Sequence, residues 1–145
     1  MHRRLIVLIC ATVIAASAVG VGVAHWRQAV ARTRDWTGFE VNGLHYAVLL
    51  PEHYDRATRY PVVLYLHQLD MGNYPEGLLK QVDGWFNTVA FRTRHPAIVV
   101  VPMLDQANDP GGRAINFGGK REGHIGEENT IAALEQVIGR YSTDP

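Results

Sequence analysis

Tyr60-Pro-Val-Val-Leu-Tyr-Leu-His67 is the stretch that decides the fold of this chain. Its apolar residues follow one another without alternation and end abruptly at a histidine. A strand buried on both faces of a parallel sheet has this pattern, and such strands deliver polar residues at their carboxyl ends. The stretch therefore predicts a central parallel strand from Val62 to Leu66, with His67 at the functional edge of the sheet.

The residues before this strand predict a β-hairpin. Thr37 to Val41 and Leu44 to Leu50 alternate apolar and polar residues on either side of Asn42-Gly43. An Asn-Gly pair between two alternating segments is the strongest short hairpin signal in a sequence. Two antiparallel strands are therefore expected to open the domain.

The residues after His67 predict a helix and a second parallel strand. Apolar residues at helical spacing, among them Trp85, Phe86 and Val89, are expected to form the core face of a helix. Gly84 interrupts this pattern. The next apolar run, Ala97 to Met103, is expected to pair in parallel with the first strand, because a helix separates the two.

The last part of the chain predicts a long loop and a further helix. Residues 104–125 are rich in glycine, and long loops in compact domains are often functional. Apolar residues from Ile131 to Tyr141 then recur at helical spacing. Glu127 and Glu128 are favourably placed at the positive end of this helix, and Arg140 at its negative end.

The first 26 residues differ in composition from the rest. Basic residues at 3 and 4 precede a stretch from Leu5 to Ala24 that carries no charge. This order is typical of a secretory signal peptide, and the stretch is also long enough to anchor the chain in a membrane. We expect residues 1–26 to be a signal peptide or a membrane anchor. The rest of the chain is then exported, and is either periplasmic or extracellular or held at the membrane.

Composition excludes several classes of function. The formal net charge is zero, and from residue 36 onward 13 acidic residues outnumber 9 basic ones, so nucleic acid is not an expected partner. The single cysteine, Cys10, lies in the apolar N-terminal stretch, which excludes a disulfide framework and a thiolate metal site. The spacing of His124, Glu127 and Glu128 is compatible with a metal site, but the solvated start of an ordinary helix has the same spacing. We therefore expect neither a metal site nor a cofactor.

The order of elements and four short motifs resemble the front half of an α/β-hydrolase. The motifs are Tyr60 to His67, Val99-Val100-Val101-Pro102, Glu128-Asn129-Thr130 and Tyr141-Ser142-Thr143-Asp144-Pro145. They are similar to segments of secreted esterases related to polyhydroxybutyrate depolymerases, feruloyl esterases and prolyl-oligopeptidase-like hydrolases. The resemblance covers residues 37–145, which are therefore expected to form a partial α/β-hydrolase domain.

That resemblance implies an α/β fold with an antiparallel hairpin, two parallel strands and flanking helices. In this family the strand that leads into the G-x-S-x-G nucleophile elbow follows the last motif, so the sheet is expected to be incomplete before that strand. No catalytic residue is assigned to the chain. Ser142 is its only serine after residue 17 and lies at a helix end without a glycine elbow.

The resemblance also implies two groups of site residues. The loop after the first parallel strand normally offers backbone N–H groups to an oxyanion, so His67, Gln68 and Leu69 are oxyanion-loop candidates. The family usually has glycine where this chain has Gln68. The substrate-loop candidates, in the long glycine-rich loop, are Asp105, Asn116 and Phe117.

These observations predict the N-terminal fragment of an exported serine hydrolase that acts on carboxylic esters or peptides. The fragment would supply the oxyanion loop but no nucleophile, so this chain alone is expected to be inactive. The alternative is a catalytically inactive exported binding module with a degenerate hydrolase fold, which the departure at Gln68 favours. The expected partner is a small-molecule ester or a polymer, and an unpaired strand edge would also permit self-association.

Overall fold

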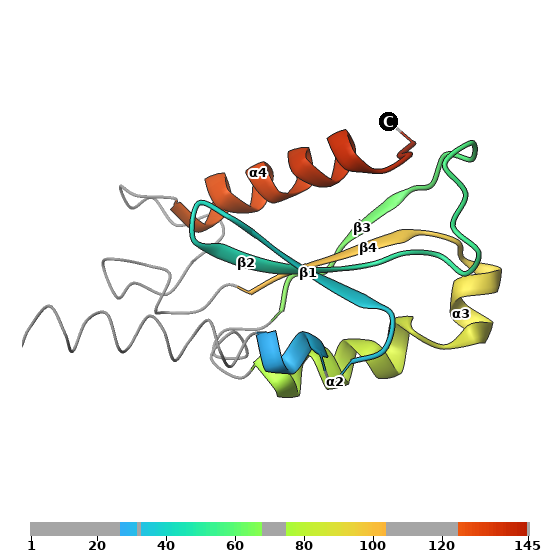
Figure 1. Cartoon of the computed structure of the whole chain (residues 1–145), viewed down its shortest axis with the longest axis horizontal. Coiled ribbons are helices and arrows are strands. Elements are labelled where there is room, and N and C mark those ends of the chain that lie inside the picture. The colour runs from blue at the N-terminus through green and yellow to red at the C-terminus, as the bar shows by residue number, and fades with distance from the viewer. Residues whose placement is uncertain (1–26, 32, 68–74, 104–124, 145) are drawn as a thin grey trace, which may run out of the picture.

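The computed structural model describes residues 27–31, 33–67, 75–103 and 125–144. They form a four-stranded mixed sheet with helices on both faces (Figure 1). After a helical turn at 27–31, the elements are β1 (Trp36–Val41), β2 (Leu44–Leu49), β3 (Val62–Leu64), α2 (Pro75–Phe86), α3 (Val89–Arg94), β4 (Ile98–Pro102) and α4 (Ile125–Arg140). The predicted α/β arrangement is confirmed, and the domain boundaries at 1–26 and 37–145 stay predictions.

β1 and β2 form the predicted hairpin. Asn42 and Gly43 connect them, and both have positive φ angles, of 49° and 81°. Two consecutive residues with positive φ define a type I′ turn, whose twist matches that of the paired strands. Pairing runs from Val41 opposite Leu44 to the far end of both strands, so the turn sets the register of the whole hairpin.

β3 runs parallel to β4, as predicted, with Val63 opposite Val99. It is shorter than the predicted strand. Tyr65 still donates its N–H to the Val100 carbonyl at 2.9 Å, but Leu66 has left the sheet and is 41% exposed. The strand order β1-β2-β4-β3 places β3 at an edge of the described sheet, as expected for a sheet that is incomplete before the elbow strand, and places β4 inside it.

Two apolar clusters cover the two faces of the sheet. Alternation along β2 sends Ala47 and Leu49 to one face and Tyr46 and Val48 to the other. The first face packs against α2 and the second against α4 (Figure 1). The buried helix residues in these clusters are Leu78, Leu79 and Val82 of α2, and Ala133 and Val137 of α4. All residues of β4 are buried, because this strand contributes to both clusters.

The predicted crossing helix is divided into two helices. α2 continues through Gly84, and α3 begins after Thr88, whose Oγ1 accepts a hydrogen bond from the Phe91 N–H at 3.1 Å. The prediction that Trp85 and Val89 belong to a core face is wrong, because these side chains are 50% and 71% exposed. Since the chain changes direction at Thr88, Val89 does not continue the apolar stripe of α2.

One arginine connects α3 to the segments that flank the hairpin. Arg92 Nη1 lies 3.1 Å from both Asp35 Oδ2 and Glu52 Oε2, and Arg92 Nε donates to the Leu50 carbonyl at 3.1 Å. The arginine side chain is largely buried, so these acceptors offset the desolvation of its charge. Local sequence patterns give no sign of this network, because the partners lie 42 and 57 residues away in the chain.

We expect Val82→Ala to lower the free energy of unfolding by about 1–2 kcal/mol, since it removes methyl groups buried against the sheet. Val89→Ala is the matched control, with the same chemical change at an exposed side chain, and should remain within about 0.5 kcal/mol of the unchanged protein. Urea denaturation followed by circular dichroism measures both. Equal effects would contradict the packing of α2 on the sheet.

Two glycine substitutions should have opposite effects. Gly43→Ala should destabilise the chain by about 1 kcal/mol, because a φ of 81° disfavours any residue with a Cβ. Gly84 lies within α2, where an added Cβ meets no atom within 4 Å, so Gly84→Ala should stabilise by about 0.5–1 kcal/mol. Thermal unfolding should show Tm shifts of opposite sign. Shifts of the same sign would disprove the conformation assigned to one of the two glycines.

Candidate functional site

The two parallel strands end at the side of the sheet where α2 and α4 begin, at the left of Figure 1. We call this side the carboxyl edge. Ligands of open α/β sheets bind outside the carboxyl ends of the strands, and helix N-termini add positive electrostatic potential there. The carboxyl edge is therefore the candidate functional site.

Of the residues predicted for the site, the structure describes His67. His67 follows β3 at the carboxyl edge, and its side chain is half-buried. The other candidates lie outside the described residues; they are Gln68, Leu69, Asp105, Asn116 and Phe117. The assignment of these residues to an oxyanion loop and a substrate loop therefore stays a prediction.

β2 begins beside the end of β4 at this edge. The His45 carbonyl accepts a hydrogen bond from the Met103 N–H at 2.8 Å, and Met103 is buried. His45 Nδ1 lies 3.7 Å from Glu40 Oε2, across the hairpin. The sequence analysis missed this pair, although a two-residue turn at Asn42-Gly43 already places position 40 opposite position 45.

Ser142 lies at the opposite end of β3 from His67. It follows α4, and its N–H donates to the Tyr54 hydroxyl at 2.8 Å. The Ser142 carbonyl accepts a hydrogen bond from the Tyr60 N–H at 3.1 Å, just before β3 begins. A nucleophile and its general base must lie within hydrogen-bonding reach of each other. Ser142 and His67 therefore do not form such a pair.

Residues 142–144 pair with the residue that leads into β3, on the side away from β4. A parallel bridge joins Thr143 to Tyr60, and the Asp144 N–H donates to the Tyr60 carbonyl at 2.8 Å. The segment therefore runs in the same direction as β3. Sequence analysis did not predict this contact.

The outer side of β3 beyond this bridge has no described strand beside it. The Pro61 carbonyl and the Tyr65 N–H bond to β4, each at 2.9 Å. Backbone groups alternate in direction along a strand, so Val62 and Leu64 direct their N–H and C=O groups away from β4. We call this side, at residues 62 and 64, the outer edge of β3.

On the α2 face, exposed apolar side chains border the outer edge of β3. The ring of Tyr65 meets that of Trp85 edge-on, with centroids 5.9 Å apart. Trp85 is half-exposed. Leu66 is also exposed, and it lies two residues after Leu64, whose side chain packs on the α4 face. These residues extend the apolar surface past the last strand of the described sheet.

On the other face, α4 presents exposed isoleucines toward the same edge. Gln136 accepts a hydrogen bond from the Tyr46 hydroxyl at 2.7 Å, and Arg140 lies over a ring of β1, so their flank of the helix faces β1 and β2. At about 3.6 residues per turn, Ile131 and Ile138 lie on the opposite flank, toward β3. They are 49% and 55% exposed. Apolar surface therefore borders the outer edge of β3 on both faces.

Within the described residues, no group of three or more His, Cys, Asp or Glu side chains is arranged to hold a metal ion. Glu127 and Glu128 lie in the first turn of α4, whereas His124 lies outside the described part of the chain. None of the described helices has the length and apolar character needed to cross a bilayer. The stretch from Leu5 to Ala24 was not among them, so its role as a signal or anchor stays a prediction.

Comparison with known proteins identifies a similar fold. The chain is similar to the crystal structure of a thermostable esterase, with a TM-score of 0.51 and 18% sequence identity over 77% of this chain. It spans 32% of the length of that esterase. No protein-family model matches the sequence, and no curated protein does so at a significant level. The chain thus has an esterase-like α/β fold.

Burial raises the pKa of two tyrosines, Tyr141 beside the C-terminal segment and Tyr46 in β2, while Arg140 opposes both shifts. The folded chain holds these phenolic protons more tightly than the unfolded chain does. The free energy of unfolding should therefore be at its full value below about pH 10 and should decrease as the pH rises further. Tyr141→Phe should make this decrease shallower, as urea denaturation at several alkaline pH values will show. An unchanged slope would contradict the burial of Tyr141.

Proposed function

We propose that this chain is the N-terminal part of an exported carboxylic-ester hydrolase. In this proposal the segment after β3 forms the oxyanion loop, with His67, Gln68 and Leu69. The loop after β4 lines the substrate pocket through Asp105, Asn116 and Phe117. A further strand packs against the outer edge of β3, and the attacking hydroxyl lies on the turn after that strand, beyond Pro145.

The observation that carries this proposal is the parallel bridge between Thr143 and Tyr60. In a parallel pair of strands, successive residues of one strand lie beside successive residues of the other. A strand that continued the direction of residues 142–144 would therefore bring position 145 beside Val62 and position 147 beside Leu64. Those are the two residues whose backbone groups face outward.

The apolar surroundings of this edge also support the proposal. A strand placed there would lie beside Leu66, with Trp85 on the α2 face and Ile131 and Ile138 on the α4 face. These are four of the five large apolar side chains that are exposed in the described structure. Exposed strand edges next to apolar surface favour aggregation, and covering them with a further strand removes this tendency.

The proposed strand would end at the carboxyl edge, because it runs parallel to β3. A serine on the turn after it would then lie next to the loop that follows His67. Serine catalysis requires a hydroxyl on a strained turn and backbone N–H donors that stabilise the developing oxyanion. Similarity to an esterase fold supports esters as the substrate class, with the acyl and alcohol groups left open.

A second candidate is a catalytically inactive exported binding module. The observation that favours it is Gln68, at a position where the resembled family usually has glycine. A side chain there restricts the backbone conformations that would direct N–H groups at an oxyanion. In this reading the loop after β4 binds an acyl group or a sugar, and no downstream elbow is required.

Reading the codons that follow Pro145 tests the proposal directly. We expect an in-frame continuation that encodes an apolar strand of about 5–6 residues and then G-x-S-x-G. The extended chain should hydrolyse p-nitrophenyl acetate, and replacing the motif serine by alanine should reduce kcat by several orders of magnitude. A stop codon directly after Pro145 would contradict the hydrolase proposal and favour the binding module.

The chain of residues 1–145 should not hydrolyse p-nitrophenyl acetate faster than buffer does. Ser142→Ala is the control, because Ser142 is the only serine outside the N-terminal stretch. Both proteins should give the same background rate. A rate that disappears with Ser142→Ala would contradict the proposal that the nucleophile lies downstream. Sedimentation of the same sample shows whether copies of this chain associate with one another through the outer edge of β3.

A further inference from the structure

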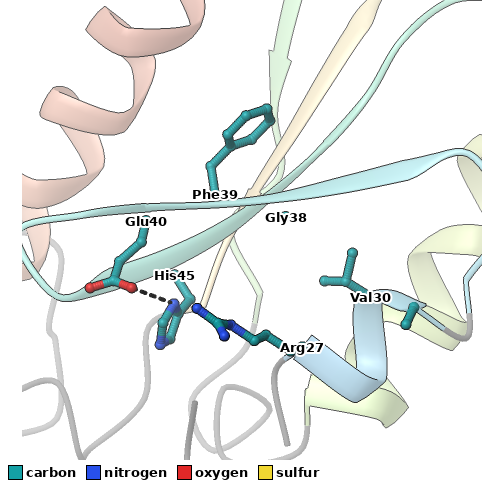
Figure 2. Close-up of a pocket in the computed structure, with 7 residues that line it drawn as sticks. Arg27, Val30, Gly38, Phe39, Glu40 and His45 are labelled. Atoms are coloured by element: carbon teal, nitrogen blue, oxygen red, sulfur yellow. Dashed lines mark ion pairs between the residues drawn. The ribbon is translucent and has the colours of Figure 1, made fainter. Parts of the chain in front are cut away.

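A pocket of about 380 Å³ lies between the helical turn at 27–31 and the hairpin of β1 and β2 (Figure 2). It opens beside β1, which lies at the other edge of the sheet from β3. β2 also lines the pocket, through His45, and β4 lies between β2 and β3. The pocket therefore lies on the β1 side of the sheet and not beside β3, and its volume is within the range of small-ligand sites.

The pocket exists because β1 carries a glycine on the face that the helical turn covers. Trp36, Gly38 and Glu40 share this face, since side chains alternate along a strand. Trp36 is buried in the core beside Ala29 of the helical turn. Gly38 has no side chain, so the space between Trp36 and Glu40 remains open beneath the turn.

The helical turn packs on the core through Ala29 and forms one wall of the pocket. Ala29 is buried in the cluster that includes Trp36 and α2. At the end of the turn, the Thr33 hydroxyl donates to the Val30 carbonyl at 2.8 Å, and the Thr33 N–H bonds to the same carbonyl at 3.1 Å. Val30 and Ala31 thus give the pocket an apolar wall.

Three ionisable side chains line the rest of the pocket. Figure 2 shows the Arg27 guanidinium directed toward His45, which lies 3.7 Å from Glu40. Among residues 27–31, 33–67, 75–103 and 125–144, no carboxylate forms an ion pair with Arg27. Within the part of the chain that the structure describes, the guanidinium thus has no ion-pair partner, and it lines a partly apolar pocket.

We infer that this pocket binds a small organic monocarboxylate. Guanidinium groups bind carboxylates through two parallel hydrogen bonds, and Arg27 offers that arrangement. The apolar wall at Val30 and Ala31 suits a compact hydrocarbon or aromatic body. Glu40 contributes a negative charge to the same pocket, and its repulsion disfavours doubly charged anions such as phosphate monoesters.

Benzoate is a suitable probe, and benzamide is its neutral counterpart of nearly the same shape. Titration of the full chain, followed by the amide NMR signals of Gly38 and His45, should show saturable binding of benzoate with a Kd in the millimolar range. Benzamide should bind at least about tenfold more weakly, because it cannot form the charge-assisted pair with Arg27. Inorganic phosphate should bind more weakly than benzoate.

Arg27→Gln should weaken benzoate binding by about tenfold or more and leave the fold intact, because Arg27 is exposed. Arg94→Gln, at an exposed arginine of α3, is the matched control and should leave the Kd unchanged. Equal binding of benzoate and benzamide, an unchanged Kd in Arg27→Gln, or NMR shifts confined to other parts of the chain would each overturn the inference. These results are independent of esterase activity, so they do not depend on the proposed function.

Discussion

The parallel pairing of β3 with β4 is the interaction on which the rest of the structure depends. β4 bonds to β3 on one side and to β2 on the other, and it contributes to the apolar clusters on both faces. It is therefore the strand that joins the hairpin, the two covering helices and β3 into one body. This pairing places His67 at the carboxyl edge, because His67 follows β3 by three residues.

Much of the fold was predictable because its signals are local. The Asn42-Gly43 pair specifies a turn with two positive φ angles, and the apolar runs at β3 and β4 specify strands that are buried or nearly so. The predictions were wrong where tertiary packing decides between similar patterns. Trp85 and Val89 have helical spacing, but α2 ends at Phe86 and Thr88 caps a new helix, in which Val89 is exposed to solvent.

The sequence pattern of β3 shows a related limit. An apolar run such as Val62 to Leu66 indicates that both faces of a strand are covered, but it does not specify how many neighbours bond to its backbone. Burial of side chains and pairing of backbone groups are separate requirements. In the described structure the side chains of β3 are partly buried, and its backbone is paired with a strand, β4, on one side.

The candidate site was less predictable, because its contacts join distant parts of the chain. Glu40 and His45 are an exception, since the hairpin register alone brings them together. By contrast, nothing in the sequence near Tyr60 indicates that it pairs with Thr143, or that Arg92 would bind Asp35 and Glu52. Sequence motifs predicted which end of the sheet to examine, whereas the geometry identified the outer edge of β3 and the pocket beside β1.

The bond between Ser142 and Tyr54 spans 88 positions in the chain. During synthesis on the ribosome, the segment that leads into β3 emerges long before its partner does. Contacts of such high sequence separation form late, because a large loop must close first. The nascent chain therefore passes through a stage in which α4 does not yet cover β3 and residues 142–144 do not yet pair with Tyr60. At that stage the apolar surface around β3 is exposed and chaperones can bind it.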